Sequence, residues 1–241
     1  MKLFVVGCSF SDYQFGKYSP EDSTYGYNLK ELLKVPYIHH ASGIGSNFRM
    51  WRKIYNEINT GNLTSKDILI VQYTDITRNE FFSNYILSKE VKSGFIESYK
   101  NDEAQKQITE PYYDGRIIKY KHREEDELDK IKFTKEERNF LKLFQNFFIS
   151  KEFSKEQFDY HHFMFQNMLA FLKIKTVFLL TNYLHEEHVD FIDSFYISKF
   201  NIEKFTQTPE YRRTKNDRGH LSQLGHEVLS NNLYQIGRAH V

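Results

Sequence analysis

The stretch Leu3-Phe-Val-Val-Gly-Cys-Ser-Phe-Ser11, close to the start of the chain, decides how the rest of the sequence is interpreted. Its first four residues are apolar and rich in β-branched and aromatic side chains, which is typical of a buried parallel strand. The strand runs into a turn of small residues that begins at Gly7. Ligands of open α/β sheets bind at the carboxyl ends of the strands, so we expect this turn to present Ser9 at such a crevice.

A second stretch, near the other end of the chain, supplies an acid and a base. Asn216-Asp-Arg-Gly-His220 places Asp217 three residues before His220, ahead of an amphipathic helix. A serine hydroxyl becomes an effective nucleophile when a base takes its proton, and a carboxylate holds that base in the required tautomer. Ser9, His220 and Asp217 are therefore the candidate catalytic residues. His226 is a competing base, which we expect to pack or to cap the helix.

These stretches resemble the first and last sequence blocks of the SGNH (GDSL-type) hydrolases, in their Gly-Cys-Ser-Phe variant. Ala41-Ser-Gly-Ile-Gly-Ser-Asn47 resembles the second block of that family, where a glycine N–H helps to form the oxyanion hole. The resemblance implies a flavodoxin-like strand order and an oxyanion hole made by the N–H groups of Ser9 and Gly45. It covers both ends of the chain but not residues 84 to 150.

The third block of the family is usually Gly-x-Asn-Asp, and here this chain departs from it. Thr74 stands where the asparagine would be, and its hydroxyl could donate a hydrogen bond over a shorter reach. Asn47 could supply the missing amide instead, because it begins a helix beside the same crevice. In the competing interpretation, Asn47 or Ser46 is only the N-cap of that helix. The sequence leaves these two interpretations open.

Strands alternate with helices along the chain, which predicts a three-layer α/β/α sandwich with a mainly parallel sheet. Within one of the helices, Ser154 and Gln157 resemble a capping box. Helices are expected at Tyr25–Leu33, Phe48–Asn59, Ser154–Leu172, Val189–Tyr196 and from Gly225 onward, and strands at Leu3–Val6, Val35–His40, Lys66–Tyr73, Thr176–Thr181 and Phe200–Phe205.

We expect one domain over residues 1–235, interrupted by a charged helical insertion at about residues 84–150. Mixed-sign charge runs of the kind found there usually form a solvated surface. The insertion is expected to form a lid, a substrate-binding cap or a partner surface. Just before it, Arg78 and Glu80 are expected to form a structural ion pair; the alternative is that they line the pocket, where Arg78 would suit an anionic substrate group. Residues 236–241 resemble the translation of a sequencing adapter, so we expect them to be a non-native tail.

Composition excludes several classes of function. Lysine and arginine number 33 against 32 aspartates and glutamates, a net charge of +1 that offers no electrostatic case for a nucleic-acid partner. The single Cys8 excludes an internal disulfide and a cysteine-based zinc site, and we expect it to be a packing residue. Adjacent residues of a strand face opposite ways, so His39 and His40 are not expected to share a metal ion. The pair His161-His162 and the pair His185/His188 are likewise expected to bind no metal.

No apolar run approaches the ~20 residues that span a bilayer, and no signal peptide precedes the first strand. We therefore expect a soluble, cytoplasmic protein without a membrane span.

The predicted function is a serine esterase acting on a small-molecule or glycan ester, without metal or organic cofactor. The alternatives are a glycan O-acyltransferase or deacetylase that uses the same residues, and a non-catalytic SGNH-like binding protein. No motif indicates the oligomeric state.

Overall fold

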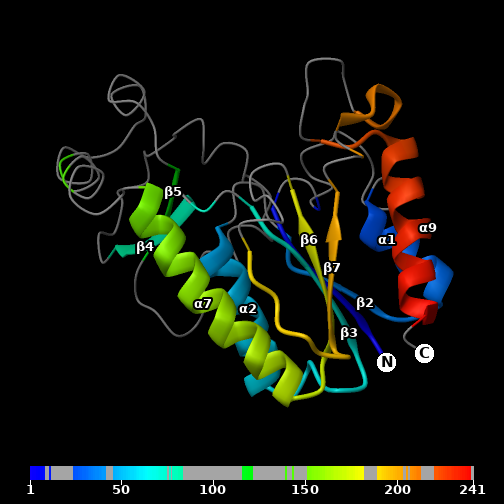
Figure 1. The fold of residues 1–241 in the computed structure, drawn as a ribbon, viewed down its shortest axis with the longest axis horizontal. Helices are drawn as coiled ribbons and strands as arrows, with labels where there is room; N and C mark the ends of the chain where they lie inside the picture. The colour runs from blue at the N-terminus through cyan, green and yellow to red at the C-terminus, as the bar shows by residue number, and fades with distance from the viewer. Residues whose placement is uncertain are drawn as a thin grey trace. The chain divides into compact units, whose positions relative to one another are not determined.

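A computed structural model gives the fold of the chain, which divides into two units (Figure 1). The first unit comprises Met1–Ile76 and Gln157–Val241, and the second comprises Thr77–Glu156. The structure describes residues 1–8, 11, 24–41, 46–74, 76, 78–83, 116–121, 139, 143, 151–181, 189–202, 205, 207–212 and 220–239.

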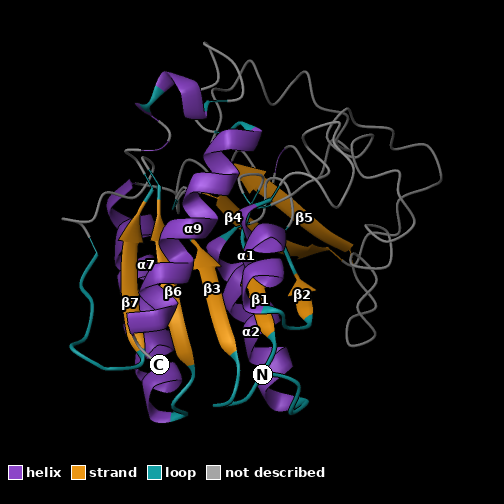
Figure 2. Cartoon of the chain, turned by 90° about the vertical axis from the view of Figure 1, so that its right-hand side faces the viewer, coloured by secondary structure: helices purple, strands orange, loops and turns teal. Residues whose placement is uncertain are grey.

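The first unit is built on a five-stranded sheet in which every neighbouring pair is parallel. The strand order is β2-β1-β3-β6-β7, which is the flavodoxin-like order that the family resemblance implies. Figure 2 shows the arrowheads of these strands at one edge of the sheet. The strands are β1 (Leu3–Val6), β2 (Tyr37–His39), β3 (Ile68–Gln72), β6 (Lys175–Leu180) and β7 (Ile197–Asn201).

Helices cover both faces of the sheet, as the predicted α/β/α sandwich requires. The side chains of β1 alternate between two separate cores: Leu3 and Val5 pack with α1 and α9, whereas Phe4 and Val6 pack with α2 and α7. Figures 1 and 2 show the same division into one pair of helices on each face. The helices are α1 (Tyr25–Leu33), α2 (Asn47–Asn59), α7 (Lys151–Phe171) and α9 (Gln223–Ala239).

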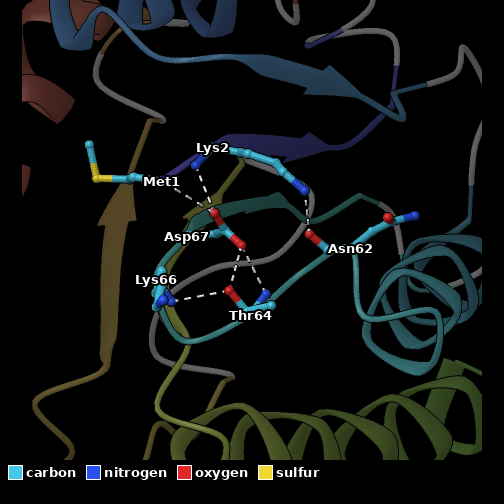
Figure 3. Close-up of polar contacts among 6 residues, drawn as sticks. All are labelled: Met1, Lys2, Asn62, Thr64, Lys66 and Asp67. Atoms are coloured by element: carbon cyan, nitrogen blue, oxygen red, sulfur yellow. Dashed lines mark hydrogen bonds and ion pairs between the residues drawn. The ribbon is translucent and has the colours of Figure 1, made fainter.

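Asp67 ties the amino ends of β1 and β3 together (Figure 3). One carboxylate oxygen accepts from the backbone N–H of Lys2 at 2.7 Å, and the other accepts from the N–H and hydroxyl of Thr64 at 3.0 and 2.9 Å. Asp67 is almost fully buried, so these bonds replace the water that the carboxylate loses. They favour the observed register, in which Leu3 lies opposite Ile68.

The second unit contains an antiparallel pair of strands, β4 (Arg78–Ser83) and β5 (Arg116–Lys121). Strand β5 lies within the range where the sequence predicts a helical insertion, so that part of the insertion is extended. Helical backbone is described there at residues 139 and 143, and most of the remaining insertion lies outside the described residues. Arg78 and Glu80 lie in register with Lys121 and Lys119 on the opposite strand.

The predicted helix at Val189–Tyr196 is wrong. This segment forms no helix, and Gln166 of α7 binds two of its backbone groups: the Gln166 amide donates to the Asp190 carbonyl at 2.9 Å and accepts from the Ile192 N–H at 3.0 Å. The fifth strand begins at Ile197 instead of Phe200. The predicted capping box is also wrong, because α7 begins at Lys151 and Ser154 is already its fourth residue.

Candidate functional site

The carboxyl ends of β1 and β3 meet at the point where the strand order reverses, which is where ligands bind in sheets of this kind. Gly7 and Cys8 follow β1, and Tyr73 and Thr74 follow β3. Asn47, the first residue of α2, contacts this edge through Thr74. Of the predicted site residues, Asn47, Thr74 and His220 are described, whereas Ser9, Gly45 and Asp217 lie outside the described residues.

Ser11 anchors the turn after β1. Its N–H donates to the Cys8 carbonyl at 3.0 Å, a bond that spans Ser9 and Phe10 in the sequence. Its hydroxyl donates to Gln72 Oε1 at 2.7 Å, so the Tyr25 hydroxyl, 2.6 Å away, must donate to Ser11. Ser11 is fully buried, and these bonds hold both residues that flank the Ser9–Phe10 pair.

Gly7 gives the Ser11 side chain the space it occupies. A Cβ at position 7 would lie 2.6 Å from Ser11 Oγ and 3.0 Å from Gln72 Oε1. Any larger residue would therefore displace the Ser11 side chain and break its hydrogen bond to Gln72 of β3. The glycine of the Gly-Cys-Ser stretch is thus required by a contact with Ser11, four positions further on, which the sequence pattern alone does not show.

Gln72, the last residue of β3, binds both Ser11 and the residues next to it in the structure, Cys8 and Tyr73. Its amide nitrogen donates to the Tyr73 carbonyl at 3.0 Å and contacts Cys8 Sγ at 3.3 Å, and its oxygen accepts from Ser11. The predicted site did not include Ser11, Tyr25 or Gln72. The signals were a second serine two positions after Ser9 and a glutamine at the end of an otherwise apolar strand.

Asn47 binds the backbone of Thr74 in both directions. Its amide nitrogen donates to the Thr74 carbonyl at 3.0 Å, and its oxygen accepts from the Thr74 N–H at 2.9 Å. The N-cap of α2 is Ser46, whose hydroxyl accepts from the Arg49 N–H at 3.1 Å. The hydroxyl oxygen of Thr74 is buried and makes no hydrogen bond within the part of the chain that the structure describes.

The closing segment is held against the sheet directly after His220. Leu221 packs with Leu3 and Val5 of β1, and its backbone pairs with Arg212 in an isolated antiparallel bridge. The hydroxyl of Ser222 accepts from the Gly225 N–H at 3.2 Å, and α9 begins at Gln223, two residues before its predicted start. His220 itself is partly buried at this junction.

His226 lies beside His220 and belongs to the packed interior. Its Nδ1 accepts from the Tyr25 N–H at 3.2 Å, and its ring stacks on the Tyr25 ring with centroids 6.1 Å apart. Burial, with a smaller contribution from nearby His220, lowers the pKa of His226 to about 3. Because Nδ1 is occupied as an acceptor, the neutral ring carries its proton on Nε2 and is poorly suited to act as a base.

The two histidine pairs that the structure describes have structural partners, whereas His185 and His188 lie outside the described residues. His39 donates to the Ser11 carbonyl at 2.8 Å, whereas His40 lies 2.9 Å from a carboxylate oxygen of Glu57, so the two rings have different partners. His162 is buried between the Tyr73 hydroxyl at 2.8 Å and the Asp190 carbonyl at 3.1 Å. Over the described ranges, no group of histidine, cysteine, aspartate and glutamate side chains could hold a metal ion. In the same ranges, no helix is long and apolar enough to cross a membrane.

Comparison with known proteins adds little to this description. No protein-family model matches the chain, and no curated protein matches its sequence. One solved structure that resembles it, from Desulfitobacterium hafniense DCB-2, is described as "a putative lipolytic protein of G-D-S-L family". It is 9% identical over 98% of each chain, with a TM-score of 0.49. At that level of similarity, the fold assignment rests on the strand order and helix layers of this chain.

Proposed function

We propose that the chain is a serine hydrolase of carboxylic esters. Ser9 is the nucleophile, His220 the general base and Asp217 the carboxylate that orients His220. The supporting observation is that Tyr25 makes two hydrogen bonds: its hydroxyl bonds to Ser11, two residues after Ser9, and its backbone N–H bonds to His226, six residues after His220. Segments from opposite ends of the chain thus contact one buried residue at the carboxyl edge of the sheet.

The proposed reaction needs only groups of this chain and water. The Ser9 hydroxyl attacks the acyl carbonyl while His220 takes its proton, and His220 then returns that proton to the departing alcohol. Water, activated by the same imidazole, attacks the resulting acyl-enzyme and releases the acid. These reaction steps require neither a metal ion nor an organic cofactor.

The proposed oxyanion hole combines the N–H groups of Ser9 and Gly45 with one side-chain donor. Thr74 is favoured as that donor, because its hydroxyl is buried at the end of β3 with no other hydrogen bond among the described residues. The Asn47 amide already binds the backbone of Thr74, so it is better placed to hold Thr74 than to reach a substrate. Losing one oxyanion donor typically costs about 2.7–4 kcal/mol of transition-state stabilisation.

The test is hydrolysis of p-nitrophenyl acetate and p-nitrophenyl butyrate by the wild type, Ser9→Ala and Ser65→Ala. Ser65 is an exposed residue before β3, so its variant controls for the loss of a hydroxyl elsewhere. We expect Ser9→Ala to lose at least about 10³-fold in kcat/KM, since removal of a nucleophile leaves little catalysis. Equal rates for the wild type and Ser9→Ala would contradict the proposal.

One observation favours a second candidate, a non-catalytic binding protein. Position 74 carries threonine, and the Asn47 amide is engaged with the backbone of Thr74, so the third donor is a hydroxyl in place of an amide. A fluorophosphonate probe separates the two candidates. An esterase should be labelled at Ser9, as shown by mass spectrometry of the tryptic peptide, whereas a binding protein should remain unlabelled.

A further inference from the structure

Four buried residues form a continuous hydrogen-bonded group across the first unit, which we call the Tyr25 network: Ser11, Tyr25, Gln72 and His226. The Tyr25 hydroxyl lies 2.6 Å from Ser11 Oγ, Ser11 Oγ lies 2.7 Å from Gln72 Oε1, and the Tyr25 N–H lies 3.2 Å from His226 Nδ1. Tyr25 is 1% exposed, and Ser11 and Gln72 are fully buried.

The direction of every bond in the network is determined. Gln72 donates to the Tyr73 carbonyl, so its oxygen must accept from Ser11. Ser11 has one hydroxyl hydrogen, so Tyr25 must donate to it. Buried polar networks whose members are all paired in one arrangement favour a single packing, because any alternative leaves a polar group unpaired.

Tyr25 occupies a special place in this network, because it contacts both ends of the chain. It is the first residue of α1, so its N–H has no partner inside that helix. His226, on α9 and 201 positions away in the sequence, accepts that N–H. At the other end of the same residue, the phenol reaches Ser11 in the opening turn.

We propose that Tyr25 is a positioning residue that sets the opening turn relative to the closing segment. This inference rests on the proposed function, since the groups to be aligned are those of Ser9 and His220. A displacement of about 1 Å between reacting groups can cost on the order of 10²-fold in rate. Loss of the Tyr25 hydroxyl should therefore reduce turnover without removing any group that touches substrate.

Tyr73 provides a matched control on the other face of the sheet. Like Tyr25 it is buried, and its hydroxyl is hydrogen-bonded, in this case to two partners, Trp51 Nε1 at 3.2 Å and His162 Nδ1 at 2.8 Å. Tyr73→Phe thus removes a comparable hydroxyl from the core between α2 and α7. Both phenylalanine variants should lower the midpoint of thermal unfolding.

The experiment compares kcat and KM for p-nitrophenyl butyrate in the wild type, Tyr25→Phe and Tyr73→Phe. We expect Tyr25→Phe to lower kcat by about 10- to 100-fold with KM changed less than about twofold, and Tyr73→Phe to change both by less than about twofold. Equal kcat for the two variants would overturn the inference while leaving Ser9-dependent hydrolysis intact. A wild type without Ser9-dependent hydrolysis would overturn the proposed function and this inference with it.

A second pair of variants tests the other bond of Tyr25. Asparagine at position 226 keeps an acceptor near the place of Nδ1, whereas leucine fills the space without one. We expect His226→Leu to lower kcat as Tyr25→Phe does, and His226→Asn to retain most of it. If the asparagine variant loses as much activity as the leucine variant although both remain folded by circular dichroism, the acceptor has no positioning role and the inference is wrong.

Discussion

The buried side-chain amide of Asn47 fixes the backbone of Thr74, which lies two residues after the end of β3. Thr74 is no longer part of the strand, so its N–H and carbonyl have lost their strand partners. Asn47 supplies a donor and an acceptor to them in one planar group. Because Asn47 and Thr74 are both buried, no water is available to take over these bonds.

We predict that Asn47→Ala lowers the free energy of unfolding by about 2–4 kcal/mol, because it leaves two buried backbone groups of Thr74 unpaired. The control is Asn167→Ala: Asn167 is exposed on α7, and its amide donates to the carbonyl of Phe163 on the same helix. That variant should change stability by less than about 0.5 kcal/mol. Urea unfolding followed by circular dichroism measures both, and equal losses would contradict the prediction.

The start of α9 depends on close contact between two backbones. The Ser222 hydroxyl accepts a hydrogen bond from the Gly225 N–H, and the Ser222 N–H donates one to the Tyr211 carbonyl at 2.7 Å. Tyr211 ends the short 3₁₀ helix η3 (Pro209–Tyr211), so this bond closes the loop that carries His220. A Cβ on Gly225 would lie 2.5 Å from the Tyr211 carbonyl oxygen, which is too close for either backbone to remain in place.

Gly225→Ala should therefore lower the free energy of unfolding by about 1–3 kcal/mol, the usual range for overpacking, although alanine favours helix formation. Asn231→Ala, an exposed substitution on the same helix, should be neutral or slightly stabilising. Thermal unfolding of the two variants tests this comparison. Under the proposed function, Gly225→Ala should also reduce esterase activity, because His220 lies in the displaced loop. A variant with wild-type stability and activity would contradict this prediction.

At the scale of the whole molecule, each face of the sheet has its own core and its own buried histidine. His226 lies in the α1/α9 layer, and His162 lies between Tyr73 and Asp190 in the α2/α7 layer. His162 donates to the Asp190 carbonyl, so it must accept from Tyr73, which in turn accepts from Trp51. A second proton on His162 would have no acceptor, and burial lowers its pKa to about 4.

Stability should fall as the solution is acidified below pH 6.5. Both histidines bind protons with a pKa near 6.5 in the unfolded chain but only near 4 (His162) and 3 (His226) in the folded one. Between these values the unfolded state binds more protons, so each histidine contributes a loss of about 1.4 kcal/mol per pH unit as the pH decreases.

The variant that tests this is His162→Gln, which cannot take up a proton. Its free energy of unfolding should decline less steeply than that of the wild type between pH 6.5 and 4, by about 1.4 kcal/mol per pH unit. Urea unfolding at half-unit pH intervals measures both slopes. Parallel curves for the two proteins would show that His162 is protonated equally in both states.

Local patterns predicted the elements whose conformation depends on their own residues. Helix α1 runs from Tyr25 to Leu33 and β1 from Leu3 to Val6, as their apolar spacing indicates. The same reasoning failed for Val189–Tyr196, where apolar residues at helical spacing pack as irregular backbone. There the side chain of Gln166, on a different element, binds the Asp190 carbonyl and the Ile192 N–H, and no local pattern carries that information.

The sequence by itself determined the class of fold, because strand and helix periodicities are properties of neighbouring residues, and it indicated Ser9, Asp217 and His220 as the residues to test. Only the tertiary structure decided the contacts that link Ser11, Tyr25, Gln72 and His226. These residues are far apart in the chain, and a hydrogen bond between them exists only once both cores have packed against the sheet. For that reason, no sequence spacing predicts that these four residues form one buried hydrogen-bonded network.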